Sequence, residues 1–250
     1  MSDTILVACG QCGNQLGYSI LDSLHTHLAS GGDSVSSSNV ELSGFFRSKG
    51  ARSSDLYARA VCFDTEPKVI DECYSRTKAA EHSHRWSYDG RGIAYSHGGA
   101  GNNWALGYEM YSGEYKEITL NCLRREIELC DSVPTLVIVH SVAGGTGSGL
   151  GTRVTETVGD EFGDLTKMNV AITPYHFGEV VVQHYNTLLC VAKISSSSDG
   201  IVVFENETAQ GLCREMKGID RPSLKDINEL IAANVAPFLL PKYHCNQRTR

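Results

Sequence analysis

A glycine-rich segment near the middle of the chain constrains the fold more than any other feature. Residues 143–149 read AGGTGSG, and they follow residues 136–141, an apolar run of strand length. Residues 150–158 are suited to a helix. A glycine-rich turn between a buried strand and a helix lets backbone N–H groups approach phosphate oxygens closely, and the helix N-terminus adds a positive dipole end. The segment therefore predicts an α/β protein that binds phosphate.

Three other interpretations of this segment are weaker. An ordinary tight turn does not need so many glycines, because each loses more backbone entropy on folding than any other residue. A Walker-type P-loop is excluded, since Gly-x-x-x-x-Gly-Lys-Ser/Thr occurs nowhere in the chain. Gly145, Gly147, Gly149 and Gly151 alternate at a spacing of two, whereas a dinucleotide motif reads Gly-x-Gly-x-x-Gly and follows the first strand. Phosphate binding remains the favoured role.

Composition bounds the class of protein and its partners. The chain has 250 residues and a net charge of −7, which argues against nucleic acid as a partner. No apolar run approaches the roughly 18 residues that span a membrane, and no secretory signal is evident, so no membrane partner is expected. Nine cysteines in apolar surroundings suit a reducing compartment, so we expect the cytoplasm. The Cys9-x-x-Cys12 pair lacks a second pair, which disfavours a redox or metal role.

Strand-like and helix-like segments alternate along the chain. Apolar runs predict strands at residues 4–8, 58–63, 136–141, 169–174 and 201–205. Apolar periodicity and capping signals predict helices ending near residue 27 and at 68–74, 115–131, 150–158 and 223–236. We expect Pro237 to stop the last helix, Ile118 to lie on the buried face of the third, and residues 31–39 and 87–107 to be irregular. This alternation predicts a doubly wound, mostly parallel, Rossmann-like sheet in one domain, with ligands at the carboxyl ends of its strands.

Other loops at those strand ends carry suitable chemistry. Residues 10–12 open the first helix and offer backbone N–H groups to a second phosphate. Asp64 and Glu66 follow the second strand, where they are either Mg²⁺ ligands acting partly through water or a solvated strand end. The glycine-rich run at residues 98–103 is placed to close over a terminal phosphate.

A guanine base needs an amide or acid on its Watson–Crick edge. Asn206 follows the last predicted strand, and Asn228 lies in the last helix. Leu224 stands one turn before Asn228 on the same helix face, where it suits packing on the flat of the base. Either asparagine taken singly is equally consistent with a surface amide.

Four separated motifs together resemble the tubulin superfamily. They are residues 10–15 (GQCGNQ), 99–105 (GAGNNWA), 143–149 and the Tyr185-Asn186 pair, and their order and spacing agree over essentially all 250 residues. Ala143 and the runs EPKVI, KMN and GEVVVQ, at residues 66–70, 167–169 and 178–183, are most similar to tubulins of the delta type. Epsilon, zeta and divergent beta types are the alternatives within the superfamily.

The resemblance implies a tubulin-type GTP-binding domain over residues 1–250, without the intermediate and C-terminal domains, that holds GTP or GDP with Mg²⁺. The residues that it assigns to phosphate are Gly10, Gln11, Cys12, Gly99, Ala100, Gly101, Asn102, Ala143, Gly144, Gly145, Thr146 and Gly147. Those near the metal are Gln11, Asp64 and Glu66, and those around the ribose are Ser141, Glu179 and Gln183. Those around the base are Gln15, Asn206, Leu224 and Asn228.

Two assigned positions depart from the common alpha and beta pattern. Gln183 stands where a ribose-binding glutamate is usual, so a hydrogen bond there lacks the strength that a charge adds. Leu224 stands where a tyrosine usually stacks on the base, so it keeps apolar cover without aromatic geometry. Both changes are expected to affect affinity more than specificity.

The resemblance also implies how the activity is completed. In tubulin-like GTPases an acidic loop of one subunit activates water on its neighbour's nucleotide, so we expect hydrolysis only with a partner tubulin subunit in longitudinal contact. The polar residues 242–250 end without a clear element, and the isolated chain is expected to be a monomer. The implied location is the cytoskeleton, at centrioles or basal bodies.

Two other functions remain open at this point. A dinucleotide-dependent oxidoreductase would need a catalytic side chain, for which His140, His176 and His184 are the nearby histidines, although His140 within a strand suits a core role. A degenerate structural homologue that binds no nucleotide is the second alternative, and intact phosphate loops argue against it.

Overall fold

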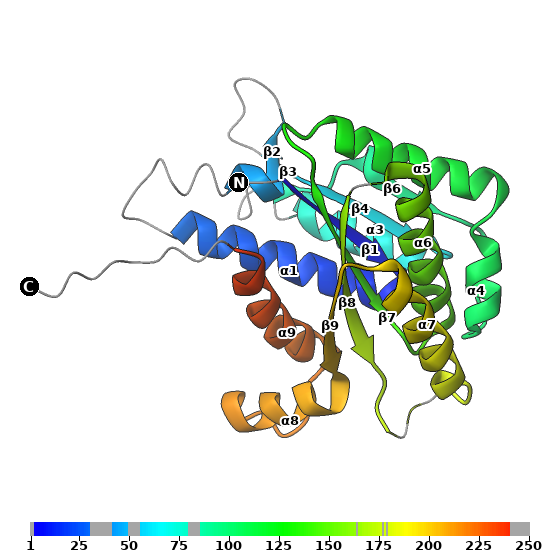
Figure 1. Cartoon of the computed structure of the whole chain (residues 1–250). Coiled ribbons are helices and arrows are strands. Elements are labelled where there is room, and N and C mark those ends of the chain that lie inside the picture. The colour runs from blue at the N-terminus through cyan, green and yellow to red at the C-terminus, as the bar shows by residue number, and fades with distance from the viewer. Residues whose placement is uncertain are drawn as a thin grey trace, which may run out of the picture.

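A computed structural model describes residues 3–30, 42–49, 56–79, 86–163, 165–176, 178 and 180–240. A six-stranded parallel sheet forms its centre, in the order β6-β4-β1-β7-β8-β9 (Figure 1). The bounds are β1 Thr4–Cys9, β4 Ala60–Asp64, β6 Ile93–Tyr95, β7 Thr135–Ser141, β8 Thr166–Thr173 and β9 Gly200–Glu205. The predicted α/β, doubly wound fold is confirmed.

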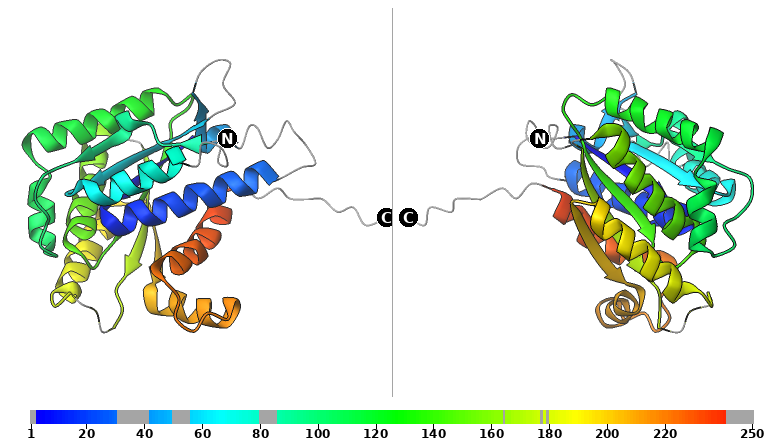
Figure 2. Two further views of the ribbon diagram at one scale, coloured as in Figure 1. Left: turned by 180° about the vertical axis from the view of Figure 1, so that it is seen from behind. Right: turned by 45° about the vertical axis from the view of Figure 1, so that its right-hand side comes forward.

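Helices cover both faces of this sheet (Figure 2). The helices are α1 Gly10–Ser30, α3 Pro67–Ala79, α4 Trp104–Met110, α5 Gly113–Glu128, α6 Gly151–Phe162, α7 Gln183–Ser197, α8 Asn206–Lys217 and α9 Leu224–Leu239. Alternate residues of β1 point to opposite faces, so Leu6 packs with α1, α3 and α9 while Val7 packs with α5 and α6. Because both faces are covered, β1 reads as a continuous apolar run.

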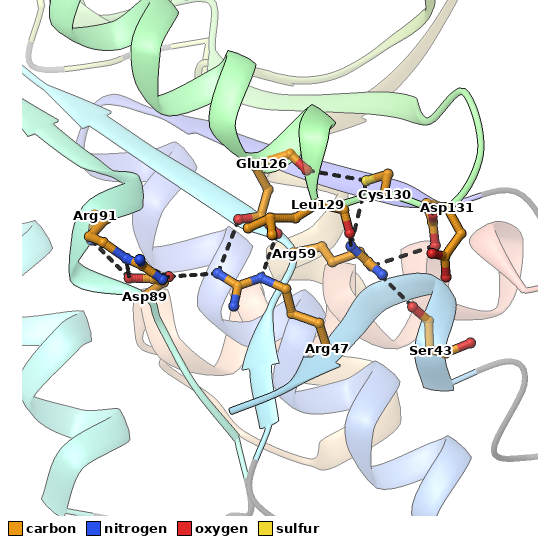
Figure 3. Close-up of polar contacts among 10 residues, drawn as sticks. Ser43, Arg47, Arg59, Asp89, Arg91, Glu126, Leu129, Cys130 and Asp131 are labelled. Atoms are coloured by element: carbon orange, nitrogen blue, oxygen red, sulfur yellow. Dashed lines mark hydrogen bonds and ion pairs between the residues drawn. The ribbon is translucent and has the colours of Figure 1, made fainter. Parts of the chain in front are cut away.

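A second, small sheet diverges from the main one at Arg59. It consists of β2 Phe46–Ser48, β3 Leu56–Ala58 and β5 Trp86–Ser87. The strand predicted at 58–63 is present as β4, but it begins two residues later, because Ala58 belongs to β3 and Arg59 separates the two strands. The buried Arg59 guanidinium donates hydrogen bonds to the carbonyl oxygens of Ser43 and Leu129 (Figure 3). It also lies 3.5 Å from the Asp3 carboxylate. These contacts stabilise the change of direction.

A neighbouring group of charges ties the small sheet to α5. Arg47 on β2 contacts the Asp89 carboxylate at 2.6 Å and the Glu126 carboxylate at 3.1 Å (Figure 3). Arg91 contacts Asp89 at 2.7 Å. Burial opposes the ionisation of Asp89, but hydrogen bonds from Arg91 and Arg47 outweigh it and hold its pKa well below the usual range.

Several element boundaries differ from those expected. Helix α9 continues through Pro237 to Leu239, because a missing N–H in the last turn removes only one bond near the end of the helix. Ile118 is exposed rather than buried, since it lies at the edge of the α5 face formed by Tyr115, Thr119 and Cys122. Residues 87–107 hold a short strand and the start of α4 rather than only loop.

Other elements agree with the sequence, with shifted ends. Strand β8 spans Thr166–Thr173, so Pro174 lies outside it, while α3 runs past residue 74 to Ala79. The capping box of Ser223 and Asp226 is present at the start of α9. Residues 31–39 and 242–250 lie outside the described residues. In the part of the chain that the structure describes, no helix is both long and apolar enough to cross a membrane.

Candidate functional site at the carboxyl edge of the sheet

The assigned loops meet at one edge of the molecule because the six strands are parallel. Residues 10–12 follow β1, residues 64–66 follow β4, residues 98–103 follow β6 and residues 141–147 follow β7. The chain crosses from β1 to β4 on one side and later returns to place β7 on the other side of β1. Such a reversal opens a crevice between the two neighbouring strands, which is where ligands bind in open α/β sheets.

The first helix and the glycine-rich segment are in backbone contact where β1 and β7 end. Gly10 has a φ of +74°, and a Cβ there would lie 2.8 Å from the Gly147 nitrogen. A Cβ on Gly147 would lie 3.0 Å from the Ser141 carbonyl oxygen. Only glycine fits such an approach, so the alternation of glycines reflects close packing between two helix starts. Residues 146–150 form a π-helical turn (Thr146–Leu150) ahead of α6.

The loop at residues 98–103 packs directly on the glycine-rich segment. A Cβ on Gly145 would lie 2.6 Å from the Asn103 nitrogen and 2.8 Å from the Ala100 carbonyl oxygen. A Cβ on Gly144 instead meets only the Asn102 Oδ1 atom, at 3.9 Å. Gly145 therefore lies at the contact between the two loops, whereas Gly144 faces open space between them.

Two contact residues were not singled out from the sequence. The Thr65 and Thr146 hydroxyls are 2.7 Å apart and join the end of β4 to the glycine-rich segment. The Asn14 Nδ2 atom donates to the carbonyl oxygens of Gly10 and Phe63, at 2.9 and 3.1 Å. Asn14 stands within the recognised run at residues 10–15, but nothing in the sequence indicates that its amide bridges two strand ends.

Asp64 and Glu66 suit a divalent cation. Burial raises the pKa of Asp64 to about 6, although backbone N–H groups of Thr65 and Glu66 partly offset it. Glu66 is exposed and directs Oε1 toward Gly99, so it lies beside the loop that packs on the glycine-rich segment. No cluster of three His, Cys, Asp or Glu side chains occurs among the described residues. Mg²⁺ usually takes one or two carboxylates and completes its shell with phosphate and water, so this pair fits that ion.

The predicted ribose residues are divided among three segments. Ser141 ends β7, and its hydroxyl accepts a hydrogen bond from the Ala143 N–H at 3.1 Å. Gln183 is the first residue of α7, and its buried amide donates to the Tyr175 carbonyl oxygen at 2.8 Å. Its Nε2 is therefore engaged by the protein, whereas no donor to Oε1 occurs among the described residues, so Oε1 can accept from a hydroxyl. Glu179 lies outside the described residues.

The predicted base residues come from three helices. Gln15 lies in α1, Asn206 begins α8 and Asn228 lies in α9, and all three side chains are half-buried. Within the described parts of the chain none of these three amides has a hydrogen-bond partner. Leu224 is 57% exposed at the start of α9, which leaves an apolar side chain uncovered one turn before Asn228. Helices α1 and α9 pack side by side (Figure 1).

The remaining sequence candidates have other surroundings. Burial raises the pKa of the Cys12 thiol to about 12, and Cys9 is fully buried, so neither thiol ionises near neutral pH. His140 is buried in β7, with Nε2 2.9 Å from the Asn169 Oδ1 atom, and burial lowers its pKa. His176 and His184 are exposed.

Comparison with known proteins identifies the family of this site. The family model described as Tubulin/FtsZ family, GTPase domain, matches residues 3–214, which include every loop described above except the start of α9. The chain belongs to the tubulin/FtsZ family. The fold and the family predicted from the motifs are thereby confirmed, and a dinucleotide-dependent oxidoreductase is not supported.

Individual relatives refine the place of this tubulin-family chain. It is 37% identical to the tubulin delta chain of Canis lupus familiaris over 96% of this chain and 53% of that protein. The tubulin delta chain of Homo sapiens is likewise 37% identical, over 96% of this chain. The tubulin epsilon chain of Mus musculus is 32% identical over 83% of this chain and 45% of that protein. The predicted similarity to the delta type is confirmed, and the chain spans about half the length of these relatives, at 53% of the dog protein.

Proposed function

We propose that the chain binds GTP or GDP with Mg²⁺ at the carboxyl edge of the sheet. The observation that carries the proposal is the backbone contact of three glycine-containing loops at the carboxyl ends of β1, β6 and β7. Backbone N–H groups from several loops, together with the positive N-terminus of α1, suit a polyphosphate without a lysine. The 12 phosphate residues named from the sequence belong to these loops.

The selectivity for guanine rests on the three amides of Gln15, Asn206 and Asn228, which have no hydrogen-bond partner among the residues that the structure describes. Asn206 and Asn228 present donors and acceptors toward the edge of a base, and Leu224 supplies apolar cover. A site built to hydrogen-bond a ring edge rejects a base with the opposite pattern, because amides that the bound base covers are then left unpaired. We therefore propose preference for GTP over ATP.

The proposal includes an assembly-linked switch rather than an isolated enzyme. By family resemblance, an acidic side chain from a neighbouring tubulin subunit activates the water, and longitudinal contact places it there. The whole chain, residues 1–250, then acts as the receiving nucleotide-binding domain, in the cytoskeleton and at centrioles or basal bodies, as the delta-type relatives suggest. Monodisperse chain should hydrolyse GTP very slowly, and turnover at ordinary enzyme rates would contradict this part.

Competition binding tests the proposal. A fluorescent GTP analogue is displaced by unlabelled GTP, GDP, ATP and NADP, with and without Mg²⁺. We expect GTP and GDP to compete far more strongly than ATP and NADP, and Mg²⁺ to strengthen GTP binding. Equal competition by ATP would contradict guanine selectivity, and no binding of any nucleotide would favour a degenerate structural homologue.

A further inference from the structure

One buried side chain joins the two phosphate loops, and it comes from neither of them. The Asn186 side chain on α7 is 3% exposed. Its Nδ2 atom donates to the carbonyl oxygens of Asn102 and Ala143, each at 2.8 Å. Its Oδ1 atom accepts from the Trp104 N–H at 2.9 Å. Every donor of this amide is thus used, and each bond reaches a different residue of the phosphate loops or of the start of α4.

These bonds fix features that the loops cannot fix alone. Asn102 has a φ of +53°, a left-handed conformation that costs a non-glycine residue free energy, and its carbonyl is one of the two that Asn186 binds. The Trp104 N–H is an orphan donor at the first residue of α4, while Asn103 caps the next two N–H groups. Asn186 therefore completes the helix start and holds the strained turn before it.

The spacing of the two loops leaves little tolerance. A Cβ on Gly145 would clash with backbone atoms of Ala100 and Asn103, so the two loops touch at that point. At Gly144 the two loops lie farther apart, because a Cβ there would meet only the Asn102 side chain. An amide that binds Ala143 on one side and Asn102 on the other sets the width of this opening.

We infer that Asn186 is a positioning residue that sets the distance between the two phosphate loops before nucleotide binds. The inference rests on the proposed function. It adds Asn186, which is not among the residues assigned to contact the nucleotide. Gln183 lies one turn earlier on the same helix, so α7 connects the proposed ribose side of the site to the phosphate side. Preorganised donors bind phosphate more tightly because less ordering is needed on binding.

The substitution Asn186→Ala tests this role through a contrast between ligands. Asn186→Ala removes all three hydrogen bonds of this side chain, including the two that join the loops. The loops can then separate, so we expect the affinity for GTP and for GDP to fall about tenfold or more. The affinity for guanosine, which lacks phosphate, should stay unchanged. If Asn186 only stabilised the fold, Asn186→Ala would lower the affinity for GTP, GDP and guanosine by the same factor. Alternatively, it would leave all three affinities unchanged at temperatures below unfolding.

Asn169→Ala is the matched control. Asn169 is also a fully buried amide, and it bonds to His140, Thr155 and Ser198 but to no residue of the two phosphate loops. We expect this variant to lose thermal stability while its ratio of GTP affinity to guanosine affinity stays at the parent value. A fall of that ratio in Asn169→Ala equal to that in Asn186→Ala would overturn the inference.

Hydrogen exchange of the parent chain supplies a test that needs no substitution. The Trp104 amide should be protected without nucleotide, because its acceptor is Asn186 rather than ligand. Free exchange of this amide until GTP is added would overturn the inference. If the parent chain binds no guanine nucleotide, the proposed function fails and the inference fails with it; if the parent binds GTP and Asn186→Ala binds it equally, only the inference fails.

Discussion

Adjacent glycines of the glycine-rich segment should respond in opposite ways to the same substitution. At Gly144 a side chain enters the opening between the loops, where the nearest protein atom is 3.9 Å from the new Cβ. At Gly145 the Cβ lies 2.6 Å from the Asn103 nitrogen and 2.9 Å from the Ala100 Cβ. Gly144→Val is thus expected to obstruct only a ligand, whereas Gly145→Val must displace the protein's own loop.

The magnitudes follow from these distances. Overpacking at Gly145 costs about 1–3 kcal/mol. In a chain of this length each kcal/mol moves the melting temperature by about 2–4 °C, so Gly145→Val should melt roughly 2–12 °C lower. Gly144 has no positive φ, so its backbone conformation is open to valine without strain. Because valine also restricts the unfolded chain, the melting temperature of Gly144→Val should be unchanged or slightly higher. Its side chain should nevertheless weaken GTP binding by at least about 100-fold, since a phosphate oxygen and a methyl group cannot share the opening.

Thermal melting without nucleotide and titration with the fluorescent GTP analogue measure the two effects separately. The parent fold makes Gly144→Val the cleaner test of phosphate approach, because a Cβ on Gly145 meets protein rather than ligand. A Gly144→Val variant that melts like the parent and binds GTP with parent affinity would refute the placement of phosphate in this opening. A Gly145→Val variant that melts like the parent would refute the loop contact.

Two further predictions concern buried charges. Because the folded-state pKa of Asp64 is raised to about 6, its ionisation destabilises the fold as the pH rises from about 4 to 6, by about 3 kcal/mol once complete. Asp64→Asn should therefore melt higher than the parent at pH 7.5 in the absence of Mg²⁺ and equally at pH 4, and a gap that does not change with pH would contradict this reasoning. Arg59→Met leaves the Asp3 carboxylate buried without its cation and should lower the free energy of unfolding by about 3–5 kcal/mol in urea titration. The exposed Arg91→Met is the control and should have little effect, so equal losses in the two variants would show that burial is not the cause.

The sequence predicts those parts of the fold whose signals are local. The apolar run of β1, the capping box at Ser223 and the glycines after β7 each follow from residues close together in the chain. The break between β3 and β4 does not, because it depends on Arg59 meeting Ser43 and Leu129, which are distant in sequence. Local rules likewise misplace the end of α9, because Pro237 lies in the last turn, where its missing N–H removes only one hydrogen bond.

The candidate site shows the same division. Motif recognition assigns the phosphate loops, because a glycine-rich turn between a buried strand and a helix is typical of phosphate binding. It does not find Asn186 or Thr65 as contacts, because an asparagine or threonine becomes informative only when its partners are known. The distance between the loops depends on tertiary contacts. The sequence shows only which residues are small enough to allow a close approach.

The central claim is that this edge of the sheet holds a guanine nucleotide. The most direct measurement is to purify the chain, denature it, and chromatograph the ligand that is released, with GTP loading of any empty protein as the second step. We predict GTP or GDP, at close to one per chain after loading. Release of NAD or NADP, or a site that stays empty after incubation with GTP and Mg²⁺, would contradict the account.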